Sequence, residues 1–264
     1  GETGQVFSLA RPFNEGARRV SLIKALRSKQ VNGTLVLAAG GDLESYSFIA
    51  AREPDRQRPN SWAGYVGMGL DALTPGPAEL AFGIEALVKE AEDAGITILA
   101  ANVEGNPFSG WKVFERQGLK ILVVGVLSPS ISEVARRRGL GQRNILDPVT
   151  SVQGAYADAL LANGRPDLWV VLGDLSEKER LELAHEVKGI DLILADFNEH
   201  GSRAGTSSQT FDAGHGGRRT NHHPIQILQP GHGRLGLLEL AFKGGLDQKR
   251  ARLTRIERLS FEPI

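Results

Sequence analysis

The sequence contains no cysteine among its 264 residues. The lack of cysteine excludes disulfides, thiolate metal sites and cysteine nucleophiles. The formal net charge is zero, so no global field would draw the chain to nucleic acid or to an anionic membrane. No apolar run approaches the ~20 residues that a membrane-spanning helix needs. We therefore expect neither a nucleic-acid partner nor a transmembrane segment.

Two common catalytic motifs are missing as well. There is no G-x-S-x-G, and Ser128-Pro129-Ser130 lacks the sharp elbow that presents a nucleophilic serine. Gly40-Gly41-Asp42 lacks the spacing of a Walker or a Rossmann loop. These absences argue against a serine hydrolase and against a domain that binds nucleotides through such a loop.

Buried-strand patterns alternate with amphipathic helical patterns along the chain, which is typical of an α/β fold. Composition is ordinary for a globular protein, and no repeat or interior linker divides it, so we expect one domain over residues 1–264. Residues 225–228 are expected to pair with 235–242, and the tail from Asp247 to form an edge strand. Helices are predicted at 16–29, 62–70, 79–94, 147–163 and 181–187, and strands at 34–39, 72–73, 96–103, 112–116, 120–127, 169–172, 189–195, 225–228 and 235–242.

The stretch from Met68 to Leu80 organises the chain, because a predicted strand ends there in a rigid turn. Thr74-Pro75-Gly76-Pro77 places a residue that can take positive φ between two prolines of fixed φ. A new helical pattern starts near Glu79. A strand that turns sharply into a helix places backbone N–H groups at the edge of an α/β sheet, where ligands bind. The turn is therefore a candidate ligand site.

The same stretch, MGLDALTPGPAEL, resembles the segment GYDAVTPGNHEFD of calcineurin-like metallophosphoesterases of the 5′-nucleotidase type. The segment NEGARRVSLIKALR is similar to GGLARRATLIKKLR of that family, and the strand that ends in Gly40-Gly41-Asp42 is similar to VLLLDAGD. The resemblance covers roughly residues 14–245, with the elements in the same order. It implies a metallophosphoesterase-like sandwich of two mixed β-sheets flanked by α-helices.

The resemblance also implies a site for two divalent cations, which this family builds from D-x-H, G-D, G-N-H-E, an isolated His and G-H-x-H. Asp42 matches the Asp that bridges the two cations. Pro77 and Ala78 stand where the family has a metal-binding Asn and a His that polarises the phosphoryl oxygen. Phe197 and Glu199 fall on the two His of the last motif. Most metal ligands of the family are therefore replaced in this chain.

The remaining motifs are also altered. Gly173-Asp174 stands where the isolated His of the family follows a strand. By its spacing from Asp42, the D-x-H motif falls on Glu2-Thr3-Gly4 without its histidine, which implies that the first strand of the family is missing or shortened. The separate C-terminal substrate domain of the family's nucleotidases is not expected within residues 1–264.

Oxygen donors remain at several of these positions, and they allow two interpretations. One is a rebuilt site for Mg²⁺ or Ca²⁺, which prefer oxygen ligands. The other is a set of solvated acids at strand ends and helix caps, which Phe197 favours because an apolar side chain would desolvate a cation. We expect no cofactor, with a divalent cation as the alternative. The vestigial candidates are Asp42, Asp174, Asp196, Asn198 and Glu199.

Residues 201–224 are poor in apolar residues, so they bury too little surface to order themselves. We predict a loop that is either mobile or ordered by a partner. A transition-metal or anion site is the alternative to a solvated polar loop. We interpret the run Arg136-Arg137-Arg138 as a solvated helix face rather than an anion-binding patch. We interpret His185 as a structural helix residue. The residues of the possible ligand or partner loop are His200, His215, Arg218, Arg219, His222, His223 and His232.

The resulting hypothesis is a catalytically inactive metallophosphoesterase-like domain that binds another protein or takes part in an assembly. The alternative is a metal-dependent phosphoric ester hydrolase with a rebuilt, carboxylate-rich site. The resemblance also implies a periplasmic or extracellular location, because the family is often exported.

Overall fold

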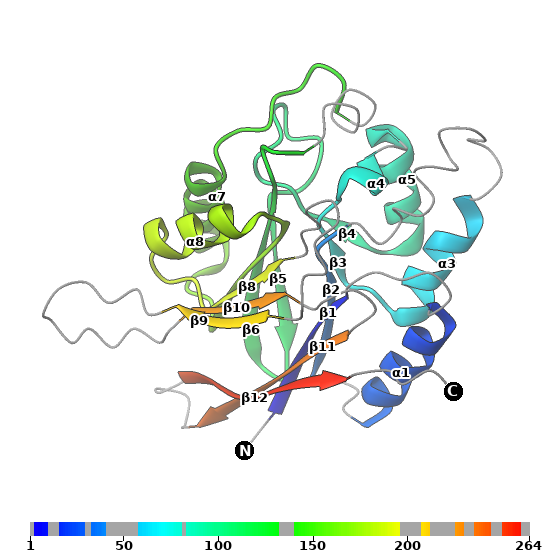
Figure 1. Cartoon of the computed structure of the whole chain (residues 1–264), viewed down its shortest axis with the longest axis vertical. Helices are drawn as coiled ribbons and strands as arrows, with labels where there is room; N and C mark the ends of the chain where they lie inside the picture. Colours follow the sequence, from blue (N-terminus) through cyan, green and yellow to red (C-terminus); the bar gives the residue numbers. More distant parts are fainter. Residues whose placement is uncertain are drawn as a thin grey trace, which may run out of the picture.

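The computed structural model describes residues 3–9, 16–29, 33–40, 58–80, 83–131, 140–195, 207–211, 225–229, 235–243 and 250–259. Within these ranges the chain forms two six-stranded mixed β-sheets with helices on their outer faces (Figure 1). This architecture confirms the predicted α/β sandwich.

Each sheet combines a parallel core with antiparallel additions. The first sheet has the strand order β12-β11-β1-β2-β3-β4, and the second has the order β5-β6-β7-β8-β10-β9. Strands β1 to β4 run parallel, as do β6, β7, β8 and β10, whereas β5, β9, β11 and β12 each pair antiparallel to a neighbour. The strands are β1 (Thr3–Leu9), β2 (Thr34–Ala38), β3 (Ala72–Leu73), β4 (Thr97–Ile98), β5 (Trp111–Arg116), β6 (Leu119–Leu127), β7 (Leu168–Asp174), β8 (Leu192–Ala195), β9 (Ser207–Phe211), β10 (Ile225–Gln229), β11 (Leu235–Lys243) and β12 (Arg250–Leu259).

Helices cover the outer face of each sheet, which gives a helix–sheet–sheet–helix arrangement (Figure 1). The first sheet is covered by α1 (Gly16–Lys29), α3 (Arg58–Met68) and α5 (Ile84–Ala94), and the second by α7 (Pro148–Asn163) and α8 (Glu177–Glu186). An apolar cluster lies between the sheets, and one further cluster lies between each sheet and its helices. Strand alternation produces this division, because successive residues of a strand face opposite sides. In β7, for example, Val170 and Leu172 face the first sheet, whereas Trp169 and Val171 pack under the helices.

Local chemistry explains where the helices begin and end. The Asp147 carboxylate caps α7 by accepting a hydrogen bond of 2.7 Å from the Thr150 N–H, and Pro148 takes the first helical position, where no N–H is needed. Ser176 and Glu179 form a capping box at the start of α8. Gly95 ends α5 in the left-handed conformation. These caps confirm the predicted start of α7 and the predicted end of α5.

The predicted helix over 79–94 is wrong in one respect, because it is interrupted. The short α4 (Pro77–Leu80) ends before Gly83, and α5 begins at Ile84. Gly83 has φ 84°, which a right-handed helix does not contain. The predicted strand over 96–103 is also too long, because β4 ends at Ile98. The next residues turn toward the second sheet, where the Ala101 N–H donates to the carbonyl of Gly125 at 2.7 Å.

The prediction that 225–228 pairs with 235–242 is wrong. β10 pairs with β8 and β9 in the second sheet, whereas β11 pairs with β1 and β12 in the first. The chain crosses between the sheets at this point, so proximity in sequence does not translate into pairing. The loop prediction for 201–224 is wrong for Ser207–Phe211, which form β9. The rest of that range lies outside the described residues. The predicted edge strand in the tail is confirmed by β12, which is the outermost strand of the first sheet.

The expectation of a missing first strand is also wrong. β1 begins at Thr3 and lies between β11 and β2, near the middle of the first sheet. Ligands of open α/β sheets lie beyond the carboxyl ends of strands. A motif of the first strand would therefore follow Leu9 rather than fall on Glu2-Thr3-Gly4. The distance between the end of β1 and Asp42 is therefore shorter than the family's spacing implies.

A charged network joins the two sheets near the amino ends of β2 and β3. The Asp71 carboxylate accepts hydrogen bonds from the Val36 N–H at 2.8 Å and from Arg116 Nη2 at 2.7 Å. Arg116, at the end of β5, also donates through Nε to the Thr34 carbonyl at 3.0 Å. Arg27 Nη2 of α1 lies 3.7 Å from Asp71 Oδ2. One carboxylate thus connects β2, the second sheet and the outer helix layer.

None of the helices that the structure describes has the length and apolar character that a membrane crossing requires.

Candidate functional site at the carboxyl edge

Parallel strands of both sheets end at a common edge, which we call the carboxyl edge. The turn after β3 meets the second sheet there, because the Thr74 hydroxyl donates to the Leu172 carbonyl of β7 at 3.1 Å. Thr74 is fully buried. Ligands of open α/β sheets bind at such an edge. The turn predicted from the sequence is therefore in the expected place for a site.

The end of β2 packs directly against this turn. Gly40 has φ 88°, and a Cβ atom at this position would clash with the backbone nitrogen of Gly76 and lie 2.6 Å from the Thr74 carbonyl oxygen. The Thr74 N–H also donates to the Ala38 carbonyl at 3.0 Å. Only glycine fits at position 40, both for its backbone angle and for its space.

The donors of the turn are used inside the protein. The Gly76 N–H donates to Glu79 Oε2 at 2.8 Å, and the Tyr65 hydroxyl of α3 donates to Glu79 Oε1 at 3.3 Å. Glu79 is fully buried. Pro77, at the start of α4, has no N–H to offer. The expectation that this turn presents backbone N–H groups to a ligand is therefore wrong for Gly76 and Pro77.

A second glutamate accepts hydrogen bonds from the loops that follow β6 and β7 in the second sheet. The Glu179 carboxylate accepts from the Ser128 hydroxyl, which follows β6, at 2.7 Å, and from the Ser176 N–H, which follows β7, at 2.7 Å. At both places a glutamate accepts the N–H of the residue three positions before it. These carboxylates therefore hold the turns that follow β3 and β7.

Asp174 is the vestigial candidate that the structure places at the carboxyl edge. It is the last residue of β7, it is half-buried, and its register partner is Leu127 of β6. Strand alternation puts it in the row of Val170 and Leu172, which face the first sheet. Asp174 therefore lies on the same side of the second sheet as the turn that contains Thr74.

The buried amide of Asn102 holds the loops beside this edge. Its Nδ2 donates to the carbonyls of Leu127 at 2.8 Å and of Leu146 at 3.1 Å, and its Oδ1 accepts from the Leu127 N–H at 2.8 Å. Asn102 thereby ties the loop after β4 to the end of β6 and to the segment before α7. This amide too has its donors and its acceptor engaged within the protein.

Comparisons with known proteins agree with this architecture. No family model matches the sequence. The chain is 26% identical over 191 residues to a 5′-nucleotidase of Vibrio cholerae, an alignment that covers 69% of this chain and 33% of that protein. Its fold superimposes on the 5′-nucleotidase precursor of Thermus thermophilus with a TM-score of 0.69 at 19% identity, covering 98% of this chain and 54% of the other. A calcineurin-like phosphoesterase of Bacillus subtilis gives a TM-score of 0.67 at 16% identity, covering 97% and 90%.

The fold is that of the calcineurin-like phosphoesterase and 5′-nucleotidase structures. The sequence resembles the 5′-nucleotidases in particular. The chain spans about a third of the length of the Vibrio cholerae relative and about half of the Thermus thermophilus chain, so the activities in their names do not transfer to this chain directly.

The described part of the chain does not fit the dinuclear centre that the resemblance implies. Pro77 and Ala78 carry no side-chain ligand atom, and Glu79 is occupied by Gly76 and Tyr65. Within the described ranges, no group of three or more His, Asp and Glu side chains is arranged to hold a metal ion.

Most of the other predicted site residues lie outside the part of the chain that the structure describes. Asp42, Asp196, Asn198, Glu199 and Phe197 lie outside the described residues, and so does the Arg136–Arg138 run. The loop candidates outside the described residues are His200, His215, Arg218, Arg219, His222, His223 and His232. His185 is described. Its Nδ1 lies 2.6 Å from Glu186 Oε1, and its side chain is 60% exposed, so it forms a surface pair and does not pack into the core.

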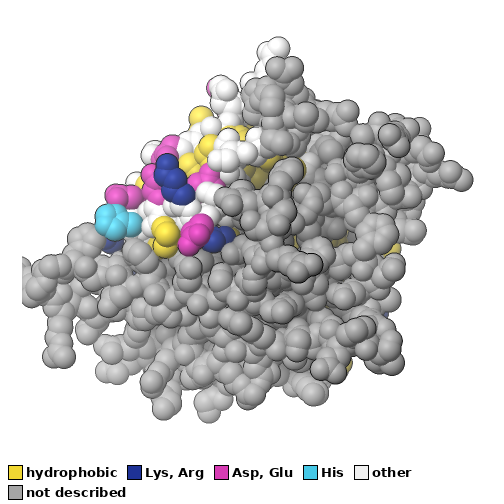
Figure 2. Space-filling view, viewed as in Figure 1, with side chains coloured by type: hydrophobic (Ala, Val, Ile, Leu, Met, Phe, Trp, Pro, Cys, Tyr) yellow, Lys and Arg dark blue, Asp and Glu magenta, His cyan; other side chains and the backbone are white. Residues whose placement is uncertain are grey.

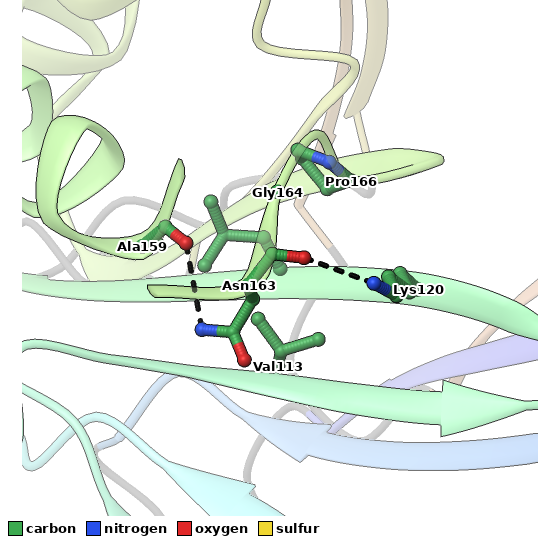
Figure 3. A pocket seen from close by; sticks show the side chains of 7 residues that line it. Val113, Lys120, Ala159, Asn163, Gly164 and Pro166 are labelled. Atoms are coloured by element: carbon green, nitrogen blue, oxygen red, sulfur yellow. Dashed lines mark hydrogen bonds between the residues drawn. The ribbon is translucent and has the colours of Figure 1, made fainter. Parts of the chain in front are cut away.

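A hollow beside α7 is lined by Val113, Lys120 and Asn163 among others (Figure 3). Lys120 Nζ donates to the Asn163 carbonyl at 2.9 Å, and no enclosed space for a water molecule remains. On the described part of the face in Figure 2, acidic, basic and apolar side chains are intermixed, with no field of one sign.

The residues that hold the carboxyl edge together were missed by the sequence interpretation. Glu79 and Glu179 were not candidates, although each lies three residues after the residue whose N–H it accepts. The spacing S-x-x-E of Ser176 and Glu179 is a capping-box signal that predicts this role. Gly76 and Glu79 have the same spacing, but glycine at the first position carries no such signal.

Proposed function

We propose that this chain is a catalytically inactive phosphoesterase-type domain that serves as a binding or assembly module for another protein. The observation that carries the proposal is that the turn after β3 uses its hydrogen-bonding groups within the protein. The turn that resembles G-N-H-E uses the Gly76 N–H and the Glu79 carboxylate for its own structure, and it places Pro77 where the family has a metal ligand.

The expected effect on chemistry is large. Loss of one transition-state donor typically costs about 10²–10³ in rate, and Pro77 and Ala78 remove two such groups at once. Without a bound metal there is no hydroxide to attack a phosphate ester at neutral pH. The Thr74 hydroxyl, another polar group of the turn, donates a hydrogen bond to the Leu172 carbonyl inside the protein. No side chain of this turn takes over the lost roles.

The alternative function is a phosphoric ester hydrolase with a rebuilt carboxylate site. The observation in its favour is Asp174, which ends β7 on the side that faces the first sheet. With Asp42 and Glu199 it would supply oxygen ligands for Mg²⁺ or Ca²⁺. One carboxylate at a strand end is weak support, because acids at such positions are commonly solvated.

We also propose a periplasmic or extracellular location. The support is indirect: the Thermus thermophilus neighbour is named as a precursor, and a chain without cysteine is compatible with an oxidising compartment.

A metal-supplemented phosphatase assay tests the proposal. With Mn²⁺, Mg²⁺ or Zn²⁺ supplied, we expect hydrolysis of nucleotides and aryl phosphates to stay at background, because Pro77 and Ala78 replace a metal ligand and a transition-state donor. Asp42→Ala and Glu199→Ala are then expected to behave like the unmodified protein. The matched control is Glu186→Ala, which removes an exposed carboxylate of α8. Turnover that is lost in Asp42→Ala or Glu199→Ala but kept in Glu186→Ala would establish a rebuilt active site.

A further inference from the structure

The outermost strand of the first sheet has one edge without a partner among the described strands. β12 pairs with β11 along Arg250–Leu259, and no described strand lies on its other side (Figure 1). An edge of this length presents a row of backbone N–H and C=O groups, which is a template for pairing with another extended chain. Native proteins restrict such pairing with charged side chains. The charges of β12 therefore decide what this edge accepts.

β12 is strongly cationic in a chain of zero net charge. It contains Arg250, Arg252, Arg255 and Arg258 but only one acidic residue, Glu257, so its formal net charge is +3. The excess is local, because acidic and basic residues are equal in number over the whole chain.

The register shows that three of the arginines share one face of the strand. Arg250, Arg252 and Arg255 are opposite Lys243, Ala241 and Glu239, which alternate along β11. The odd spacing between Arg252 and Arg255 is absorbed by an irregularity between Glu239 and Leu240, where the β12 residue between Leu253 and Arg255 has no register partner. Leu253 and Ile256 are opposite Leu240 and Leu238, on the other face. Glu257, opposite Leu237, also falls on the arginine face, and Arg258, opposite Gly236, falls on the other. The first face thus has three arginines and one glutamate, and the second is mainly apolar with one arginine.

We propose that β12 is a docking edge for an extended acidic segment of a partner protein, which adds to the first sheet as a further strand. Side chains directly opposite each other in neighbouring strands interact, so Asp or Glu opposite Arg252 and Arg255 stabilises the pairing. Like charges in these positions destabilise it, so a second copy of β12 is disfavoured. The preferred segment alternates acidic residues with apolar ones, which match Leu253 and Ile256.

This inference rests on the proposed binding function, to which it adds a surface and a partner chemistry. The two are tested separately. Phosphatase activity reports on the carboxyl edge, whereas peptide binding reports on β12, so either result can fail without the other.

Fluorescent peptides of about nine residues, the upper range of common strand lengths, test the inference with the full chain. The probe alternates Glu and Val. One control replaces every Glu with Lys, and a second keeps the Glu but places prolines at alternate positions, which removes strand pairing and preserves charge. We expect saturable binding of the Glu-Val peptide only. Equal binding of the proline-containing peptide would show charge attraction without strand addition, and no binding of the Glu-Val peptide would also overturn the inference.

Charge reversal locates the site. Arg252→Glu with Arg255→Glu is expected to lower the affinity for the Glu-Val peptide by about tenfold or more. The same double variant is expected to raise the affinity for the Lys-Val peptide. The matched control, Lys178→Glu with Lys188→Glu, reverses two exposed charges on and beside α8 and is expected to leave both affinities unchanged. If the reversed pair does not fold, as judged by circular dichroism, Arg252→Gln with Arg255→Gln replaces it, with an expected loss of about threefold. Equal weakening by the arginine and lysine variants would contradict a site on β12.

Discussion

Replacing Gly40 with alanine is expected to lower the melting temperature by about 4–20 °C. The new Cβ atom would clash with the backbone nitrogen of Gly76 and approach the Thr74 carbonyl. Neither group can move easily, because the turn is held by Pro75 and by the hydrogen bond from Thr74 to Leu172. A positive φ at a residue with a side chain adds about 1–2 kcal/mol to the overpacking cost of about 1–3 kcal/mol. Thermal unfolding followed by circular dichroism measures the total.

The matched control for Gly40→Ala is Gly154→Ala in α7. No atom lies within 4 Å of a Cβ placed at Gly154, and the position is inside a helix. Alanine there is expected to stabilise the protein by about 0.5–1 kcal/mol. If Gly40→Ala melts within about 2 °C of the unmodified protein, the end of β2 is not packed against the turn.

Replacing Asp71 with alanine is expected to destabilise the protein by about 3 kcal/mol. The substitution removes the carboxylate that accepts hydrogen bonds from the Val36 N–H and from the Arg116 guanidinium. The Asp71 side chain is only 15% exposed, so water replaces it poorly. Breaking one side of a partly buried charged network costs more than its net contribution, because the remaining charge stays desolvated. Chemical denaturation gives the change in the free energy of unfolding.

One variant separates charge from hydrogen bonding in this network, and an exposed ion pair serves as the control. Asp71→Asn keeps an acceptor for the Val36 N–H but loses the charge that pairs with Arg116, so an intermediate loss is expected. Asp93→Ala removes an exposed partner of Lys89 on α5 and is expected to change stability little, because solvent screens such pairs. An Asp71→Ala protein as stable as Asp93→Ala would mean that the network does not join the sheets.

Much of the fold follows from local sequence patterns. The apolar runs of β6 and β7 are buried along almost their whole length, and the hairpin between β5 and β6 turns at Gln117-Gly118, both with positive φ. Asp147-Pro148 and Gly95 mark helix ends by their own chemistry. These features depend on residues that are neighbours in the chain.

The features that sequence patterns did not predict depend on distant residues. β10 and β11 are close in sequence but join different sheets, because their partners β8 and β1 are far away in the chain. The same holds at the carboxyl edge. The prolines of the turn predict rigidity, but only the position of Tyr65 on α3 shows that Glu79 is held inside the protein. From sequence alone, a glutamate that stabilises a turn cannot be distinguished from one that binds a ligand, because the difference lies in its hydrogen-bond partners.

Metal binding distinguishes an inactive carboxyl edge from a rebuilt one, because an edge that no longer holds catalytic cations gains no stability from added metal. The measurement is the melting temperature as Mn²⁺ is raised to about 1 mM, with Asp42→Ala in parallel. We expect no change in either protein. A site with a dissociation constant of about 10 μM would instead stabilise the unmodified protein by about 2.7 kcal/mol at that concentration. A rise of several degrees that disappears in Asp42→Ala would show that the edge still holds a cation and would contradict the proposed inactive domain.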